Sequence, residues 1–185
     1  MIEIRWHGRG GQGVVTVSKL LASSALTEGK YIQAFPEFGP ERMGAPIKSF
    51  TRISDEPITI HSQVTNPDVV VVLDPTLIGE IDLTEGLKKD GVLIVNTTKS
   101  PQELKKKLKV KRVYALDATK IAQESIGRPI PNVPMLGALV KATGLLNLEP
   151  IIKDVRESFQ KKFKDEVIEG NVKALERAYR EVKEG

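Results

Sequence analysis

The sequence predicts an α/β fold: a Rossmann-like open, mostly parallel sheet with an antiparallel hairpin and C-terminal helices. Three continuous apolar runs, residues 69–73, 92–95 and 113–116, each end in polar residues, which is typical of strands buried on both faces of a parallel sheet. A glycine-rich loop also connects an N-terminal strand to a helix and a second strand, which is how a βαβ unit begins. The 185 residues suit a single domain spanning residues 1–185.

Alternation and helical spacing define the elements of the first third of the chain. The predicted elements are a strand at residues 2–6, a helix at Val14–Thr27 and a strand at residues 31–35. Residues 47–53 also alternate, and an apolar return at residues 58–60 predicts a hairpin between these two segments. Pro57 indicates that the hairpin lies at an edge of the sheet, because proline cannot donate to a ladder of hydrogen bonds.

Helices dominate the remaining chain. Short helices are expected near residues 84–89 and Pro101–Leu108, and from Asn132 onward the sequence is helical, with Gly144 ending the first helix. Two apolar stripes at helical spacing follow: Leu148, Ile151, Ile152, Val155, Phe159 and Phe163, then Ile168, Val172, Leu175, Tyr179 and Val182. The stripes of this last third exceed what one small sheet needs to cover its faces. We therefore expect the C-terminal helices and the loop at residues 36–46 to bury a large patch against partner chains.

The composition restricts the class of protein. With 40% hydrophobic and 28% charged residues, the chain is typical of a globular protein and too apolar for a disordered one. A formal net charge of +4 does not require a nucleic-acid partner. No run approaches the roughly 18 apolar residues of a membrane span, and the N-terminus lacks the order of a signal peptide, so a cytoplasmic location is expected. The many charged residues, few Met and absent Cys favour a thermophilic source.

No catalytic device is recognisable in the sequence. The absence of Cys excludes a thiol nucleophile and a cysteine-ligated zinc or iron–sulfur site in this chain, and two His argue against a histidine-rich metal site. There is no P-loop lysine and no nucleophile–histidine–carboxylate pattern. Three polar residues, Asp74, Asn96 and Asp117, follow the predicted strands, where capping and turn formation are the favoured roles.

The first candidate ligand site is the glycine loop, residues 8–13, which satisfies the pattern G-x-G-x-x-G. It consists of Gly8, Arg9, Gly10, Gly11, Gln12 and Gly13. Glycines let the backbone turn sharply and approach a ligand closely, and the N-terminus of the following helix favours a phosphate. The alternative is a tight strand–helix turn without a ligand, since glycines also permit close packing.

An ordinary NAD enzyme is disfavoured. Glu37 lies near the place of the ribose-binding acid, but it follows Pro36 in an irregular loop, and the chain is short for a dehydrogenase with a substrate domain. We expect weak binding of NAD(P) or none.

The second candidate site is the loop at residues 39–46, which contains Arg42. If the sheet is parallel, this loop and the glycine loop meet at one edge of the sheet. The guanidinium of Arg42 could bind a phosphate or a carboxylate with two hydrogen bonds. The alternative is that Arg42 pairs with Glu41 or Glu37 and stiffens the loop.

Together the two loops resemble the gamma subunit of 2-oxoacid:ferredoxin oxidoreductases, of the pyruvate or branched-chain (2-ketoisovalerate) type. The resemblance rests on the Gly-Gly-Gln-Gly core and the Glu-Arg-Met-Gly loop. It continues in residues 68–74, 132–138 and 171–174 and covers nearly the whole chain.

The resemblance implies a role within a complex. Such a complex oxidatively decarboxylates a 2-oxoacid on thiamine diphosphate and Mg²⁺, passes electrons through iron–sulfur clusters to ferredoxin, and transfers the acyl group to coenzyme A. The cofactors would belong to the alpha, beta and delta subunits, and the isolated gamma chain would not be catalytic. Its implied work is assembly and part of the coenzyme A site, with the glycine loop and Arg42 as the contacts. The alternative is a stand-alone Rossmann-type oxidoreductase or regulatory module that binds a nucleotide.

Overall fold

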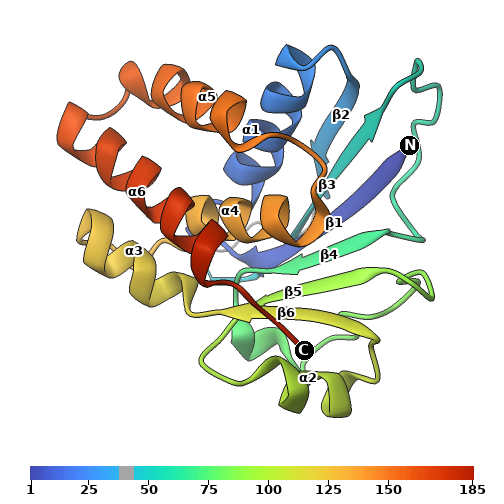
Figure 1. Ribbon diagram of the computed structural model, residues 1–185. Coiled ribbons are helices and arrows are strands. Elements are labelled where there is room, and N and C mark those ends of the chain that lie inside the picture. The colour runs from blue at the N-terminus through green and yellow to red at the C-terminus, as the bar shows by residue number, and fades with distance from the viewer. Residues whose placement is uncertain (38–43) are drawn as a thin grey trace.

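A seven-stranded sheet with helices on both faces forms the core of the molecule (Figure 1). The computed structural model describes residues 1–37 and 44–185. The strands are β1 (Ile2–Arg9), β2 (Tyr31–Pro36), β3 (Pro46–Ser54), β4 (Val69–Val72), β5 (Val92–Asn96), β6 (Arg112–Leu116) and β7 (Lys183–Glu184). The helices are α1 (Val14–Thr27), the 3-10 turn η1 (Pro75–Leu77), α2 (Pro101–Leu108), α3 (Ala118–Ile126), α4 (Asn132–Thr143), α5 (Leu148–Gln160) and α6 (Asp165–Glu181).

The strand order is β2-β3-β1-β4-β5-β6-β7. Strands β1, β4, β5 and β6 are parallel neighbours, whereas β3 is antiparallel to both β2 and β1, and β7 is antiparallel to β6. The predicted fold class, a mostly parallel open sheet with an antiparallel pair, is confirmed.

The continuous apolar runs are explained by burial on both faces of the sheet. Val69 and Val71 of β4 join a core with α1, α3, α4 and α6, and we call this side the α4 face. Val70 and Val72 join a second core with Leu77 after β4 and Leu104 of α2, on the side that we call the α2 face. Alternate residues of a strand point to opposite faces of the sheet. When helices cover both faces, the residues that point to either face must be apolar, which gives a continuous apolar run.

Helix α4 lies between the sheet and α6, which adds a layer on the α4 face (Figure 1). It is buried along most of its length, and at Gly137 the backbone carbonyl of Leu175 in α6 leaves no room for a Cβ. The apolar stripes of α5 and α6 therefore pack within the chain. The exposed large apolar residues in the described part are Met1, Leu26, Tyr31, Ile60 and Phe163. The premise of the predicted partner patch, that these stripes exceed what the chain itself can cover, is wrong, because α4 needs covering and α6 packs on it. The burial of the C-terminal helices and the loop at residues 36–46 against partner chains stays a prediction.

The predicted hairpin between residues 47–53 and 58–60 was wrong, because β3 has other partners. β3 pairs with β2 and β1, while residues 58–60 form no strand. Pro57 consequently marks no sheet edge, and the edge strand on this side of the sheet is β2, which ends at Pro36. The insertion of β3 also separates β2 from β1 by one strand.

Two helical predictions also need correction. Residues 84–89 form turns rather than a helix, and Gly86 adopts a φ of 67° against the backbone of Thr65. α3 and the short strand β7 were not predicted. α3 begins directly after Asp117, whose carboxylate accepts a hydrogen bond from the Lys120 N–H at 2.9 Å. In the described part, no helix has the length and apolar character needed to cross a membrane.

Candidate functional site

The glycine loop lies at the carboxyl edge of the sheet, where the connections diverge. β1 extends through Gly8 and Arg9, so the turn itself comprises residues 10–13. The chain after β1 continues into α1 on the α4 face, whereas the chain after the neighbouring β4 continues to the α2 face. Such a divergence between adjacent strands opens a crevice in which ligands of open α/β sheets bind.

Three of the four glycines of the loop are needed for different reasons. A Cβ at Gly8 would lie 2.5 Å from Val14 Cγ2 and 3.2 Å from Leu73 Cβ, so Gly8 serves close packing of α1 on the sheet. Gly13 has a φ of 77° and faces the side-chain amide of Asn132 at the start of α4. Gly11 has a φ of 92°, and nothing lies within 4 Å of its Cβ position. Packing therefore explains Gly8 and Gly13, while Gly11 presents an open backbone.

Two backbone N–H groups of the turn already have acceptors within the chain. The Gly10 N–H donates to the Ala45 carbonyl at 3.1 Å, and the Gln12 N–H donates to the Arg9 carbonyl at 3.2 Å. α1 begins after Gly13 with no side-chain cap and no acidic residue in its first turn. The first N–H groups of α1 are thus the donors best placed to receive an anion.

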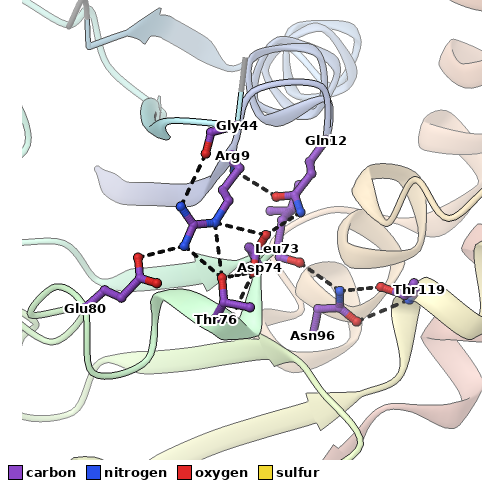
Figure 2. A network of polar contacts seen from close by, with 9 residues as sticks. All are labelled: Arg9, Gln12, Gly44, Leu73, Asp74, Thr76, Glu80, Asn96 and Thr119. Carbon is purple, nitrogen blue, oxygen red and sulfur yellow. Dashed lines mark hydrogen bonds and ion pairs between the residues drawn. The ribbon is translucent and has the colours of Figure 1, made fainter. Parts of the chain in front are cut away.

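Arg9 braces the loop against the end of β4 (Figure 2). Its guanidinium donates to Thr76 Oγ1 at 2.9 Å and to Glu80 Oε2 at 2.7 Å, and its Nε lies 3.5 Å from Asp74 Oδ2. It also donates to the Gly44 carbonyl at 3.3 Å. Two carboxylates therefore balance the positive charge of Arg9, which ties together three segments of the chain.

Gln12 completes this network. Its side-chain oxygen accepts from the Arg9 N–H at 2.8 Å, and its Nε2 donates to Asp74 Oδ2 at 2.6 Å. Asp74 also accepts from the N–H and the hydroxyl of Thr76 at 2.9 and 2.6 Å. Burial raises the pKa of Asp74, but the hydrogen bonds from Thr76 and Gln12 outweigh burial and keep the pKa below its ordinary value. Asp74 is an ionised structural acceptor.

Asn96 connects two further strand ends (Figure 2). Its side-chain NH₂ donates to the Leu73 carbonyl and to Thr119 Oγ1, both at 2.8 Å, and its oxygen accepts from the Thr119 N–H at 3.2 Å. Asp74 caps η1 and Asp117 caps α3, which confirms the predicted capping roles of these two residues. Asn96 instead forms a long-range bridge, so its predicted local capping or turn role was wrong.

The second candidate loop is described only in part. Arg42 and Glu41 lie outside the described residues. Its final residues contact the glycine loop, because Ala45 accepts from Gly10 and Pro46 lies opposite Arg9 in the β1–β3 ladder. The predicted meeting of the two loops is confirmed at this end.

Glu37 is poorly placed for the ribose of a dinucleotide. Its Oε2 lies 3.4 Å from Lys48 Nζ, and its N–H donates to the Lys48 carbonyl at 3.0 Å. Because β3 lies between them, β2 and β1 are two strand spacings apart, about 10 Å in all, rather than one.

Two basic residues of β1, Arg5 and His7, are buried and hydrogen bonded to each other. His7 is 1% exposed, and its Nε2 accepts from Arg5 Nε at 2.9 Å. Burial, with the positive charges of Arg5 and Lys48, lowers the pKa of His7 to about 3, so the imidazole is neutral. Arg5 also donates to the carbonyls of Leu83 and Glu85 at 3.2 and 2.7 Å. The sequence gave no sign of the role of Arg5, because the carbonyls that it binds lie about 80 residues away.

The comparisons with known proteins agree along the whole chain. The family model described as pyruvate ferredoxin/flavodoxin oxidoreductase matches residues 3–181. The chain is 53% identical to pyruvate synthase subunit PorC of Thermotoga maritima over 98% of this chain and 94% of that protein. The chain belongs to the pyruvate ferredoxin/flavodoxin oxidoreductase family. The resemblance predicted from the two loops is confirmed.

Further relatives in this oxidoreductase family agree in name and structure. The common subunit gamma of the pyruvate/ketoisovalerate oxidoreductases of Thermococcus kodakarensis is 54% identical over 97% of this chain and 96% of that protein. The crystal structure of the pyruvate oxidoreductase subunit PORC of Thermotoga maritima has a TM-score of 0.89 at 50% identity, covering 100% of this chain and 98% of that chain. These family members are named as subunits, and the chain spans nearly their full length.

Proposed function

We propose that this chain is the gamma subunit of a pyruvate or branched-chain 2-oxoacid:ferredoxin oxidoreductase that works in the cytoplasm with alpha, beta and delta subunits. The observation that carries the proposal is identity above one half, over almost the full length, to relatives that are named as subunits of such enzymes. The complex would convert the 2-oxoacid and coenzyme A to acyl-CoA and CO₂ and reduce ferredoxin.

The residues of this chain fit a non-catalytic share of that reaction. Iron–sulfur clusters are held by Cys thiolates, and the chain has no Cys. Among residues 1–37 and 44–185, no three His, Asp or Glu side chains are grouped to hold a metal ion, so these residues do not fit the Mg²⁺ that accompanies thiamine diphosphate. Both cofactors are assigned to the other subunits.

We assign the glycine loop to the coenzyme A site. Coenzyme A carries three phosphates, and the loop offers the open backbone of Gly11 and the uncapped N-terminus of α1. Arg9 and Gln12 would hold the loop in place through Asp74, because their polar groups are already paired. Arg42 would supply the cation that Arg9 does not, since two carboxylates balance the charge of Arg9.

Co-purification and activity test this function. The tagged chain is co-expressed with its alpha, beta and delta partners and is also purified alone. We expect 2-oxoacid-dependent reduction of ferredoxin in the co-purified complex only. Turnover by the isolated chain with thiamine diphosphate, coenzyme A and an electron acceptor, well above a buffer blank, would contradict the subunit role.

The alternative, a stand-alone nucleotide-binding oxidoreductase, is tested by titrating the isolated chain with NAD and NADP in a calorimeter. The distance between Glu37 and the glycine loop leads us to expect weak binding or none. A micromolar dissociation constant, about −8 kcal/mol, would revive that alternative.

A further inference from the structure

We propose that the edge strand β2 is the surface through which two copies of this chain pair, antiparallel and about a two-fold axis, to form a dimer with one continuous sheet. The inference uses residues of this chain alone and does not depend on the proposed function. An unprotected sheet edge, a self-complementary register and an exposed apolar border beside that edge each support it.

The two edges of the sheet differ in their protection against pairing. β7 consists of Lys183 and Glu184, which are both charged and exposed, and short, charged edge strands discourage pairing with another chain. β2 has six residues, Tyr31–Pro36, with no charge among them and a proline only at the end. Among residues 1–37 and 44–185, β3 is the only strand that pairs with β2. Pairing is therefore favoured at β2, and a two-fold axis there closes the assembly at two copies.

The ladder with β3 shows which backbone groups of β2 face the free edge. The Glu37 N–H donates to the Lys48 carbonyl at 3.0 Å, and hydrogen-bonded pairs alternate along an antiparallel ladder. Counting back from Glu37, every second residue of β2 therefore bonds to β3. The backbone polar groups of the residues between them, Ile32, Ala34 and Pro36, point away from β3.

These groups select one register for a second copy. Pro36 has no N–H, and the Lys30 N–H already donates to the Ala25 carbonyl at 3.1 Å. If Ile32 of one copy lies opposite Ala34 of the other, the copies exchange four hydrogen bonds and satisfy every N–H and carbonyl of these two residues that faces the edge. A shift by two residues would put Ile32 opposite Pro36 or Ala34 opposite Lys30, and a carbonyl would lack its donor.

The same register places compatible side chains opposite each other. Gln33 lies on the two-fold axis and faces its own copy. Tyr31, which is 47% exposed, comes opposite Phe35 of the second copy, on the face of the sheet where the Phe35 ring lies 5.3 Å from the ring of Phe50. Aromatic pairs across neighbouring strands stabilise a sheet. No residue of Tyr31–Pro36 is charged, so like charges do not meet in this ladder.

The helix layer continues across the same axis. α1 packs on both β2 and β3 beside this edge (Figure 1), so its axis lies above the space between these strands. The two α1 helices of a dimer would then lie two strand spacings apart, about 10 Å, which is close to the 8–10 Å between packed helices. Leu26, in the last turn of α1, is 58% exposed. Leu26 and Tyr31 form the apolar border that pairing would cover.

One like-charge contact opposes the pairing and gives it a salt dependence. Lys19 is the only charged residue of α1, and it is exposed. Two α1 helices packed side by side bring both copies of Lys19 to one interface, where salt screens their repulsion. The dimer should therefore be at least as strong in about 0.5 M salt as in about 0.05 M salt. A dimer that dissociates in the higher salt would be held by ion pairs instead and would overturn the proposal.

Sedimentation of the full chain at about 1 to 300 µM tests the dimer. We expect a reversible monomer–dimer equilibrium with a dissociation constant of about 100 µM or lower and no larger species. Ala34→Pro removes an N–H that faces the free edge and does not bond to β3, so it should abolish the dimer. Tyr31→Lys should weaken it at least tenfold. Phe163→Lys, which changes an aromatic residue that is 43% exposed elsewhere, is the matched control and should leave the dimer unchanged.

A single introduced cysteine tests the register, because the chain has no Cys of its own. Gln33→Cys would place two thiols on the axis, with Cα atoms about 4.5 Å apart in a pair without hydrogen bonds, which is within the range of a disulfide. We expect oxidised glutathione to link this variant into dimers. Tyr31→Cys is the control, because its two copies would be offset by four residues, about 13 Å, and should stay unlinked.

The outcomes decide between a second copy and other occupants of the edge. A monomer at every concentration would overturn the proposal, and so would a dimer that Phe163→Lys weakens as much as Tyr31→Lys does. A link through Tyr31→Cys but not Gln33→Cys would overturn the register. If the chain alone is monomeric and Ala34→Pro prevents co-purification with the other subunits, the edge holds a segment of another subunit and the second copy is excluded. Unchanged melting temperatures show that the variants are folded. If Gln33→Cys unfolds because Arg52 loses an acceptor, the sedimentation variants decide.

Discussion

Alanine substitutions at the glycines of the glycine loop distinguish a packing role from a ligand-binding role. Gly8→Ala places a Cβ against Val14, Gly13→Ala meets the Asn132 amide in a left-handed conformation, and Gly11→Ala faces open space. If Gly11 is needed for a ligand rather than for packing, its substitution should be mild for stability and harmful for binding.

The structure sets the order of the stability losses. A left-handed φ costs a non-glycine residue about 1–2 kcal/mol, and this is the only penalty for Gly11→Ala. Gly8→Ala carries no φ penalty but overpacks the contact with Val14, whose β-branched side chain is stiff in a helix, for about 1–3 kcal/mol. Gly13→Ala combines both effects and should cost the most. At roughly 2–4 °C per kcal/mol for a chain of this length, Gly11→Ala should lower the melting temperature by about 2–8 °C.

The assays are thermal unfolding of the chain and the KM for coenzyme A of the assembled complex. Gly29→Ala is the matched control, because Gly29 has a φ of 78° with nothing within 4 Å of its Cβ position and lies outside the loop. We expect Gly11→Ala and Gly29→Ala to destabilise the chain similarly, and only Gly11→Ala to raise the KM for coenzyme A. An unchanged KM in the Gly11→Ala complex would refute the assignment of the loop to the coenzyme A site. If Gly11→Ala destabilised the chain more than Gly13→Ala does, the packing argument would be refuted.

Three further predictions follow from the site and its support. Arg42→Ala in the complex should raise the KM for coenzyme A about tenfold to a hundredfold, because a charge-assisted contact is worth about 1.5–3 kcal/mol. The KM for the 2-oxoacid should hardly change. If both KM values stay unchanged and the complex dissociates more readily, the loop is an assembly element. The pKa of His7 is about 3 in the folded chain and 6.5 in the unfolded chain, so the free energy of unfolding should fall by roughly 1.4 kcal/mol per pH unit as the pH decreases from 6.5 towards 3. Urea titrations at several pH values should show that this free energy depends less on pH in His7→Gln. An equal pH dependence in the two proteins would contradict a buried neutral imidazole. Asn96→Ala should lose about 1–3 kcal/mol, since the buried Leu73 carbonyl loses a donor, and a urea midpoint equal to that of the unmodified chain would contradict the bridging role.

The sequence predicted best the elements whose signals are local. The helix Val14–Thr27 and the helix Pro101–Leu108 have the predicted bounds. Apolar spacing predicted the first helix, and in the structure a capping box fixes the start of the second. Gly144 ends α4, as predicted, and adopts a left-handed conformation there. The strands β4, β5 and β6 were recognisable because burial on two faces leaves a continuous apolar run.

The pairing of β3 was not predictable in the same way. Its alternation indicates a strand but does not select a partner, and the nearby apolar residues 58–60 suggested a hairpin. In the structure, Arg52 of β3 is 1% exposed and donates to Glu3 of β1 at 2.9 Å and to Gln33 of β2 at 3.1 Å. These long-range contacts fix β3 between two strands, and no local pattern reports them.

The candidate site shows the same division between local and distant information. The glycine loop and the capping roles of Asp74 and Asp117 follow from their positions beside strand ends. The pairing of Arg9 with Glu80 joins residues 71 apart in sequence. Arg9 lies in the glycine loop and was therefore expected to contact a ligand. Only the structure shows that the carboxylates of Asp74 and Glu80 pair with its guanidinium.

The burial of α4 changes what an interface with partner subunits must look like. The exposed surface of α6 carries ion pairs, with Arg156 of α5 donating to Glu169 at 2.7 Å and Arg177 to Glu181 at 2.6 Å. Among residues 1–37 and 44–185, the exposed large apolar side chains are few and come from separate segments, although Met1 and Ile60 line the same hollow. Many subunit interfaces are no more apolar than the rest of a protein surface and depend on a few buried anchors within a polar rim. Partners of this chain would therefore use isolated anchors such as Ile60 among charged groups, which makes the strength of the assembly depend on ionic strength.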